Sequence, residues 1–588
     1  MFWQFVNRNR YAVFFMLLLF CFFQFSIRRL YGFSIFPDEF SYWAYAAEAA
    51  GCDWSEVISL GSFYSYGYSI LLLPIFMLCK DPVTAYRTAV GVNFILLGLS
   101  YMLLLEIQRM QEQFFVEKTN RLSGADRTED EKKQICAGIA MLYPPMLFYA
   151  QTTMAETVLM CGYLLLILLV GSYLREPGTG KLLLVFAVNF FLYVVHMRTV
   201  GTLLVCAGLL LFTAIRNRKN HKEALVILIM TAGILLAAEL LERQMMTHLY
   251  HNLDSELYEI NTYEGQLDKI KYIFSKAGWT AFTAGFIGKI LYLGISTYGL
   301  GWWGLLYFFR KARHGRKKCQ PGFFVMVSVL AQIGISTVYN VIPDSYDSIT
   351  FGRYQDYIVP VLLVAGMEEI LTHSRERKRC LMVSALLLLL LSVIVSVYAV
   401  KAELTQSKGY FMTGISFFEM DPLRPAAFYA GNCAIGILCM CIVMAMTALY
   451  SKTGLHQVLL FCMLLFIVMA IRLGSRYLYP FNELARQDIR MTERMEKLAK
   501  DEAYEPWLTY LDYNEISAIG LIQFTLRDLP VKVVAGYGDG TRIPYGEIGE
   551  RSIVLLGGND PRQEELESMY EKEVISGHFV LLYNERGQ

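Results

Sequence analysis

The stretch that decides the fold is YAVFFMLLLFCFFQFSI at residues 11–27, which is followed by FPDEFSYWAY at residues 36–45. Residues 11–27 carry no charge and are long enough to cross a bilayer as a helix. They are rich in Phe and contain no small-residue cleavage site, so we expect a retained membrane helix rather than a signal peptide. Two adjacent acids followed by aromatic residues therefore stand where the chain has just crossed a membrane.

The segment after this span has the features of a helix start. Pro37 suits the first turn of a helix, because its missing N–H would have no partner there. Asp38 and Glu39 follow in that turn, where the helix dipole favours negative charge. Asp38, Tyr42 and Tyr45 recur at i, i+4 and i+7 and so share one face. The segment is either an interfacial helix with an acidic start and an aromatic belt, or part of a catalytic site.

The composition of the whole chain is that of a polytopic helical membrane protein. Of its 588 residues, 55% are hydrophobic and only 18% are charged, and the mean hydropathy is +0.39. The hydrophobic residues gather in repeated runs of membrane-spanning length. The formal net charge is +1, which gives no reason to expect a nucleic-acid partner. The 12 cysteines are scattered, with no CxxC pair and no Cys/His spacing typical of a metal site.

Clusters of Lys and Arg recur along the chain, with enough apolar sequence for two spans between successive clusters. All the clusters therefore face the same side, which the positive-inside rule identifies as the cytoplasm, together with the N-terminus. The clusters lie at residues 106–134, 174–181, 216–222, 310–318 and 374–379. The same counting predicts about thirteen spans and an external C-terminal segment. The expected spans are 11–27, 85–105, 135–150, 155–173, 182–196, 199–215, 224–241, 282–309, 322–341, 357–372, 381–400, 426–449 and 457–473.

The chain divides into a membrane domain at residues 1–474 and a more polar segment at residues 475–588. In the membrane domain, residues 30–82 form a long external loop, whose apolar run at 70–78 predicts an interfacial or re-entrant helix. The polar segment alternates strands and helices, which predicts a small α/β domain outside the membrane. Its expected strands are 507–512, 531–535, 552–557 and 579–583, and its expected helices are 483–502, 514–529 and 562–572.

The Gly557-Gly558 pair in the polar segment follows an expected strand. Backbone N–H groups after a strand can cradle an anion. The pair lacks the GxGxxG and P-loop patterns, so a plain turn is the alternative and is several times more frequent.

Three further charged residues are expected at the same membrane face as Asp38. Glu156 opens the fourth span, either as a charge favoured at a helix start or as a second active-site acid. Arg198 lies at the next outward turn, where an interfacial anchor is the alternative to a functional role. Arg353 lies on the external side against the positive-inside bias, and it can bind a phosphate or pair with a nearby aspartate. The candidate aspartates are Asp344, Asp347 and Asp356.

Acids and arginines on one face indicate chemistry on a phosphorylated substrate. The acids can act as a general base or hold a divalent cation. Asp38 and Glu156 are the candidate ligands of such a cation, either Mg²⁺ or Mn²⁺. The arginines can stabilise a phosphate leaving group. Because the sequence has no P-loop and little nucleotide is available outside the cell, such a phosphate would arrive on a lipid. The expected set is Asp38, Glu39, Glu156, Arg198 and Arg353.

These features resemble the polytopic glycosyltransferases of the GT-C superfamily, in particular the protein O-mannosyltransferases and aminoarabinose transferases. The acidic pair of that family in the first external loop is similar to Asp38-Glu39, and its second acid is similar to Glu156. Its Arg near the start of the second span is similar to Arg87, and the Gly-Arg-Tyr…Pro of later loops in related bacterial members is similar to residues 352–360. Residues 64–74 resemble its aromatic loop, but the Lys-Pro-Pro-Leu-type motif of the family is not present.

The resemblance implies a multi-pass glycosyltransferase of the plasma membrane. It would move a sugar from a polyprenyl-phosphate carrier to a hydroxyl of a glycan, lipid or protein. Asp38 would take the acceptor proton, and Glu39 and Glu156 would orient the acceptor or bind a metal. Arg353 and Arg198 would stabilise the lipid-phosphate leaving group. The other expected substrate-binding residues are Tyr42, Tyr66, Arg87 and Tyr354.

Two other classes of protein share some of these features. A transporter or flippase of a lipid-linked or anionic substrate would use the same acids and arginines as a gate, and would also need polar groups near the bilayer midplane. The expected spans are mostly apolar, with Asn189 and Glu239 among few exceptions, which disfavours that class. A polymerase or ligase of surface glycans shares the lipid carrier but not the early acidic pair.

Overall fold

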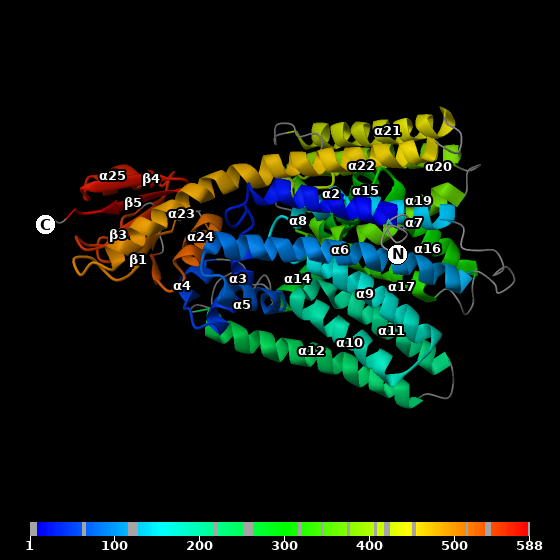
Figure 1. Cartoon of the computed structure of the whole chain (residues 1–588), viewed down its shortest axis with the longest axis horizontal. Helices are drawn as coiled ribbons and strands as arrows, with labels where there is room; N and C mark the ends of the chain where they lie inside the picture. Colours follow the sequence, from blue (N-terminus) through cyan, green and yellow to red (C-terminus); the bar gives the residue numbers. More distant parts are fainter. Residues whose placement is uncertain are drawn as a thin grey trace.

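Long helices that run side by side form most of the computed structural model of the chain (Figure 1). A five-stranded sheet lies at one end of these helices, next to the C-terminus. The protein is therefore a helical, multi-pass membrane protein with a small C-terminal α/β domain, as the sequence predicts. The structure describes residues 9–60, 66–115, 127–216, 221–250, 263–314, 320–342, 345–372, 377–404, 408–416, 424–449, 454–512, 516–534 and 542–585.

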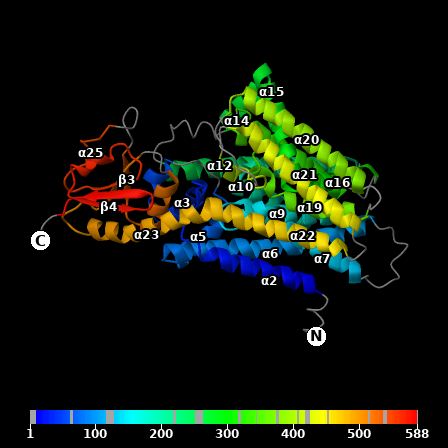
Figure 2. The ribbon, with the colours of Figure 1, turned by 90° about the horizontal axis from the view of Figure 1, so that it is seen from above.

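In this described part of the chain, nine helices are long and apolar enough to cross a membrane. Eight of them correspond to all or most of α2 (Arg10–Ile27), α6 (Pro82–Phe115), α9 (Glu156–Arg175), α11 (Val200–Arg216), α12 (His221–Leu249), α17 (Gln320–Tyr339), α20 (Arg377–Lys401) and α21 (Pro425–Leu449). The ninth begins in α22 (Gly454–Leu473) and continues through a π-helical segment, Gly474–Leu478, into α23 (Tyr479–Ala499). Figure 2 shows α15, α20 and α21 on one side of the bundle and α2 on the other.

The number of about thirteen spans is not confirmed, although the other predicted stretches are also largely helical. They correspond to α7 (Arg127–Met141) with α8 (Pro144–Tyr149), α10 (Thr179–Val195), α15 (Lys276–Ser296) with α16 (Leu300–His314), and α19 (Val359–Thr372). Helices α10 and α19 have 17 and 14 residues. At 1.5 Å per residue, α19 is too short to cross a hydrocarbon core of about 30 Å by itself.

The stretch 282–309, expected as one span, contains a helix break. Helix α15 ends at Ser296 and α16 begins at Leu300. Between them Tyr298 and Gly299 have φ angles of 51° and 80°, in the left-handed region. Glycine enters this region without steric cost, so Gly299 allows the chain to leave one helix and start the next.

Three short helices follow the first span, at the end of the bundle that carries the sheet (Figure 1). They are α3 (Asp38–Ala49), α4 (Ser55–Ile58) and α5 (Ser69–Leu78). Helix α5 contains Pro74, has only 10 residues and packs on α3. It is therefore the short apolar helix that the sequence predicts, rather than a full span.

The C-terminal sheet has the strand order β2-β1-β3-β5-β4. Strands β1 (Leu508–Leu511), β2 (Val531–Val534) and β3 (Ile553–Gly557) are parallel, and α24 (Ile516–Leu526) connects the first two. Strand β5 (Phe579–Tyr583) runs antiparallel to β3 and to the edge strand β4 (Lys572–Ser576). The apolar strands β1, β3 and β5 are buried throughout, as strands covered on both faces should be.

The expected helix 562–572 is wrong in its second half. Helix α25 covers only Gln563–Glu567, and β4 begins at Lys572. Strand β4 pairs with β5 alone, and its side chains are exposed or half-buried, so it shows no apolar run. An edge strand of this kind carries little signal in the sequence.

The C-terminal domain rests on the first external loop. Helix α24 packs on α3 and α4. Arg527, at the end of α24, donates hydrogen bonds to the carbonyl oxygens of Phe76 (2.8 Å) and Cys79 (2.9 Å). The indole of Trp54 donates to the carbonyl oxygen of Arg527 at 2.7 Å. The domain is thus joined to the helix that carries Asp38.

Candidate active site

The start of α3 is anchored by Glu39. Its carboxylate accepts hydrogen bonds from the backbone N–H of Ser34 (2.7 Å) and of Thr153 (2.6 Å), and from the hydroxyls of both residues. The hydroxyl of Tyr86 donates to it at 2.9 Å. Burial raises the pKa of Glu39, and the hydrogen bonds from Ser34 and Thr153 act in the opposite direction. Glu39 therefore ties α3 to the preceding loop, to α6 and to the turn before α9.

Asp38, beside it, belongs to a chain of four charged groups. Asp38 Oδ2 lies 2.5 Å from Arg353 Nη1. Arg353 Nε donates to Glu156 Oε1 at 2.8 Å, and Arg198 Nη2 donates to the same oxygen at 3.1 Å. Glu156 thus holds two guanidinium groups with one carboxylate oxygen.

The four groups are almost completely withdrawn from solvent, since none of their side chains is more than 5% exposed. Two carboxylates and two guanidiniums balance each other in charge. Removing charges from water is costly, and the cost is offset only where partners and hydrogen bonds are complete. They are incomplete here, because Arg198 Nε, Arg198 Nη1 and Glu156 Oε2 are buried without a hydrogen-bond partner in the described chain. The cluster can therefore accept a further polar group.

Each charged residue lies at, or next to, the end of a different helix. Asp38 and Glu156 are the first residues of α3 and α9, where the helix dipole favours a carboxylate. Arg198 lies on a single 3₁₀ turn, Met197–Thr199, between α10 and α11, and its backbone N–H donates to His196 Nδ1 at 3.3 Å. Arg353 opens α18 (Arg353–Asp356), just before α19. Four helix ends therefore meet at one point.

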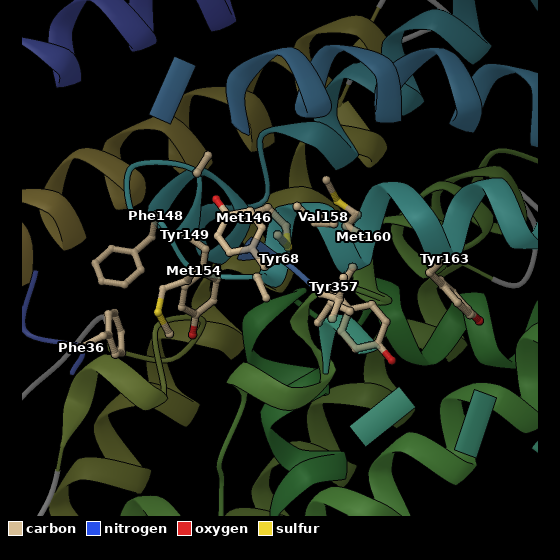
Figure 3. Close-up of a cluster of buried hydrophobic side chains, with 14 of the residues drawn as sticks. Phe36, Tyr68, Met146, Phe148, Tyr149, Met154, Val158, Met160, Tyr163 and Tyr357 are labelled. Carbon is tan, nitrogen blue, oxygen red and sulfur yellow. The ribbon is translucent and has the colours of Figure 1, made fainter. Parts of the chain in front are cut away.

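Aromatic and apolar side chains surround this point. The guanidinium carbon of Arg198 lies 4.7 Å from the ring centroid of Tyr354 and 5.5 Å from that of Tyr357. The guanidinium carbon of Arg353 lies 5.5 Å from the ring of Phe36. Figure 3 shows Phe36 beside Phe148 and Tyr149 of α8, with Tyr357 and Tyr163 further along the same buried cluster. Such a lining keeps water out and strengthens electrostatic interactions.

The other predicted site residues divide into near and distant ones. Tyr354 stacks on Arg198, and Tyr42, one turn after Asp38, is buried close enough to interact electrostatically with all four charged groups. Tyr66 packs on Tyr45 instead, with ring centroids 6.4 Å apart. Arg87 donates to the carbonyl oxygen of Leu30 at 2.8 Å and lies against Tyr31. The structure thus brings Tyr42 and Tyr354 to the charged cluster, but not Tyr66, Arg87 or Glu39.

The aspartates considered as partners of Arg353 have other contacts. Asp356 Oδ1 accepts hydrogen bonds from the hydroxyls of Tyr143 and Tyr292, each at 2.8 Å. Asp347 accepts from the backbone N–H of Lys408 at 3.0 Å. Asp344 lies outside the described residues. Arg353 pairs instead with the two acids predicted for the site, Asp38 and Glu156.

One supporting residue was missed at the level of sequence. Lys289 of α15 is fully buried and donates to the carbonyl oxygens of Ser348 (3.0 Å) and Ile349 (3.3 Å). It holds the segment that leads to Arg353. A single lysine inside an otherwise apolar helix is the signal that could have identified it.

A divalent cation at Asp38 and Glu156 stays a prediction. In this structure the guanidinium of Arg353 contacts both carboxylates. No group of three or more His, Cys, Asp or Glu side chains gathers as a metal site anywhere in the residues that the structure describes. Cations of this kind need several oxygen ligands.

No protein-family model and no curated protein matches the chain. Among solved structures, the chain is similar to ArnT from Cupriavidus metallidurans bound to undecaprenyl phosphate, with a TM-score of 0.49 and 12% identity over 98% of both chains. The apo state of the same protein gives a TM-score of 0.49 and 13% identity over 97% of both chains. Arabinosyltransferase EmbB from Mycobacterium smegmatis gives 0.42 and 13%, covering 80% of this chain and 41% of that one.

Proposed function

We propose that the protein is a membrane glycosyltransferase that moves a sugar from a polyprenyl-phosphate carrier to an acceptor hydroxyl. The observation that supports this most strongly is the buried cluster in which two arginines share Glu156 beside Asp38. It combines a carboxylate that can take a proton with two guanidinium groups that can bind a phosphate. The acceptor would be a glycan, a lipid or a protein, and no nucleic acid is involved.

The nitrogens of Arg198 that have no hydrogen-bond partner in the described chain, Nε and Nη1, suit a phosphate. A buried N–H group without a partner costs about 1–3 kcal/mol. A phosphate oxygen can accept a hydrogen bond from Arg198 Nε or from Nη1, because guanidinium N–H groups are charged donors that suit phosphate. Arg198 is 3% exposed, so the bound phosphate would be held away from water.

A phosphate that reaches this site would come along the membrane. Glu156 and Arg198 lie at the ends of two candidate membrane helices, Glu156–Arg175 and Met197–Arg216. A lipid carrier can place its phosphate at such helix ends while its polyprenyl chain lies against the apolar spans. We propose that these ends face the outside of the plasma membrane, with the C-terminal domain, and that the N-terminus is cytoplasmic.

The proposed reaction uses Asp38 as general base. The donor phosphate competes with Asp38 for Arg353, which frees the carboxylate to accept the proton of the acceptor hydroxyl. The acceptor oxygen attacks the anomeric carbon, and the bond from that carbon to the phosphate oxygen breaks. The leaving polyprenyl phosphate keeps the electron pair, and Arg198 and Arg353 stabilise its charge. Glu156 positions the two arginines, and Glu39 positions α3.

The test is release of polyprenyl phosphate by purified protein in detergent, with a panel of radiolabelled polyprenyl-phosphate sugars. We expect release by the wild type and none by Asp38→Asn. The matched control is Asp81→Asn, because Asp81 is an exposed acid at the start of α6 that bonds only locally to the N–H of Thr84. Full activity of Asp38→Asn would refute its role as base. No release from any donor would contradict the proposal and favour a transporter or flippase, which flux in proteoliposomes would then measure.

A further inference from the structure

The C-terminal sheet contains a topological switch point. From β1 the chain passes through α24 to β2 on one side, and then returns to β3 on the other side of β1. Because β1 and β3 are parallel, their carboxyl ends meet at the same edge of the sheet. In open α/β sheets, ligands bind outside the carboxyl ends of the strands at such a point.

A buried arginine lies at this edge. Arg562 follows β3, and its Nε and Nη2 donate to the two carboxylate oxygens of Asp560 at 2.9 and 2.7 Å. Its Nη2 also donates to the carbonyl oxygen of Asp512, the residue after β1, at 3.2 Å. The side chains of Arg562 and Asp560 are 1% and 0% exposed. The arginine therefore bridges the ends of the two strands.

Two polar atoms at this bridge have no partner in the described chain. They are Arg562 Nη1 and Asp512 Oδ1, and both are buried. Groups of this kind are nearly always hydrogen-bonded in folded proteins. One is a donor and the other an acceptor, on two residues that already touch through the backbone of Asp512.

The charges at this edge show what kind of ligand would fit. Asp512 and Asp560 together carry one more negative charge than Arg562 neutralises, which opposes an anion. The neighbouring Gly558 N–H donates to the carbonyl oxygen of His578 at 2.8 Å, so it is not available to cradle an anion either. Gly557 therefore ends β3, and Gly558 begins a plain turn. Hydroxyl groups both donate and accept, so adjacent hydroxyls of a sugar match Asp512 Oδ1 and Arg562 Nη1.

We propose that this edge of the sheet, formed by Asp512, Asp560 and Arg562, binds a neutral carbohydrate. Resting on the proposed function, the carbohydrate is the acceptor glycan of the transferase. The domain packs through α24 on α3, the helix that begins at Asp38. A glycan bound here is therefore held by a domain that contacts the helix of the proposed base.

The experiment measures binding of labelled neutral hexasaccharides to full-length protein in nanodiscs, without donor. The panel contains gluco-, manno-, galacto- and N-acetylglucosamine hexamers. We expect saturable binding of at least one hexamer by the wild type, and at least a tenfold weaker binding by Asp512→Asn and Arg562→Lys. Asp512 Oδ1 has no hydrogen-bond partner in the described chain, and Asp512→Asn keeps the size of the side chain, so we expect this variant to fold even where the Arg562 variant does not.

Two controls separate this proposal from the transferase reaction. Asp501→Asn changes an exposed acid of the same domain, which only caps the N–H of Ala503, and should bind like the wild type. Asp81→Asn, which changes an exposed acid outside this domain, should also bind like the wild type. Failure of the release assay with intact hexamer binding would refute the proposed function and not the carbohydrate site. No saturable binding by the wild type, or unchanged binding by Asp512→Asn, would overturn the carbohydrate site.

Discussion

Glu156 holds the charged cluster together, and Glu156→Gln tests this role directly. The substitution keeps the size of the side chain but removes the charge that Arg198 and Arg353 share at 3.1 and 2.8 Å. In the wild type, two carboxylates face two guanidiniums. After the substitution, Asp38 alone faces both. Because the groups are at most 5% exposed, water cannot compensate for the lost charge.

The expected loss is large for one substitution. Breaking a buried ion pair by removing one partner costs about 3–5 kcal/mol of unfolding free energy. Adding Arg198→Gln restores the balance, since Asp38 and Arg353 remain as a pair at 2.5 Å. The double variant should therefore be more stable than the sum of the two single changes predicts, by about 2–3 kcal/mol.

The assay is reversible unfolding in mixed micelles by denaturing detergent, followed by tryptophan fluorescence. The control cycle uses Glu176→Gln and Lys181→Gln, because that pair has the same distance of 3.1 Å but side chains that are 77% and 34% exposed. Exposed pairs couple by about 0.2–1 kcal/mol. Additivity of Glu156→Gln and Arg198→Gln within about 0.5 kcal/mol would refute the view that one carboxylate balances both arginines.

Three more predictions concern the surroundings of the site. Glu39→Gln places amide hydrogens against the N–H groups of Ser34 and Thr153, and should cost about 2 kcal/mol of unfolding free energy while the activity per folded molecule falls less than in Asp38→Asn. Equal loss of specific activity in both variants would show that Glu39 takes part in the chemistry. Arg527→Ala removes the hydrogen bonds to the carbonyl oxygens of Phe76 and Cys79 at the end of α5. Limited proteolysis should therefore cut between the C-terminal domain and the bundle faster than in wild type, whereas the surface variant Lys532→Ala should be cut like the wild type. Equal cleavage of Arg527→Ala and wild type would mean that the hydrogen bonds of Arg527 do not hold the C-terminal domain on the bundle. Chelation by EDTA should leave release of polyprenyl phosphate unchanged, because Arg353 lies between the two acids; loss that Mg²⁺ or Mn²⁺ restores would instead place a cation there.

Local pattern was enough to locate most elements. The uncharged run 11–27 and the Pro-Asp-Glu start at residues 37–39 correspond to α2 and α3, because span length and helix-start chemistry depend only on neighbouring residues. The break in the helix after Ser296 could not be predicted from the local pattern. The stretch around it is apolar on both sides, and only the left-handed backbone of Tyr298 and Gly299 separates the helices. The edge strand β4 was missed because its pairing with β5, rather than its composition, makes it a strand.

For the candidate site, the residue types could be read from the sequence but their partners could not. Asp38, Glu156 and Arg198 each stood out as a charge next to an apolar run, which is a local property, and Arg353 stood out as an arginine on the external side. Three aspartates near Arg353 in the sequence were equally suitable partners, and Arg353 pairs with two distant acids instead.

The sequence by itself therefore determined that this is a helical membrane protein, where its charged residues interrupt the apolar runs, and that an α/β domain ends the chain. Only the tertiary structure decided that Glu39 is an anchor while its neighbour Asp38 joins the cluster, and that Arg562 bridges β1 and β3. The physical reason is that hydrophobic length and periodicity act over a few turns of chain. An ion pair such as that of Arg353 with Glu156, 197 residues apart, depends on which helix ends the packing of the whole bundle brings together.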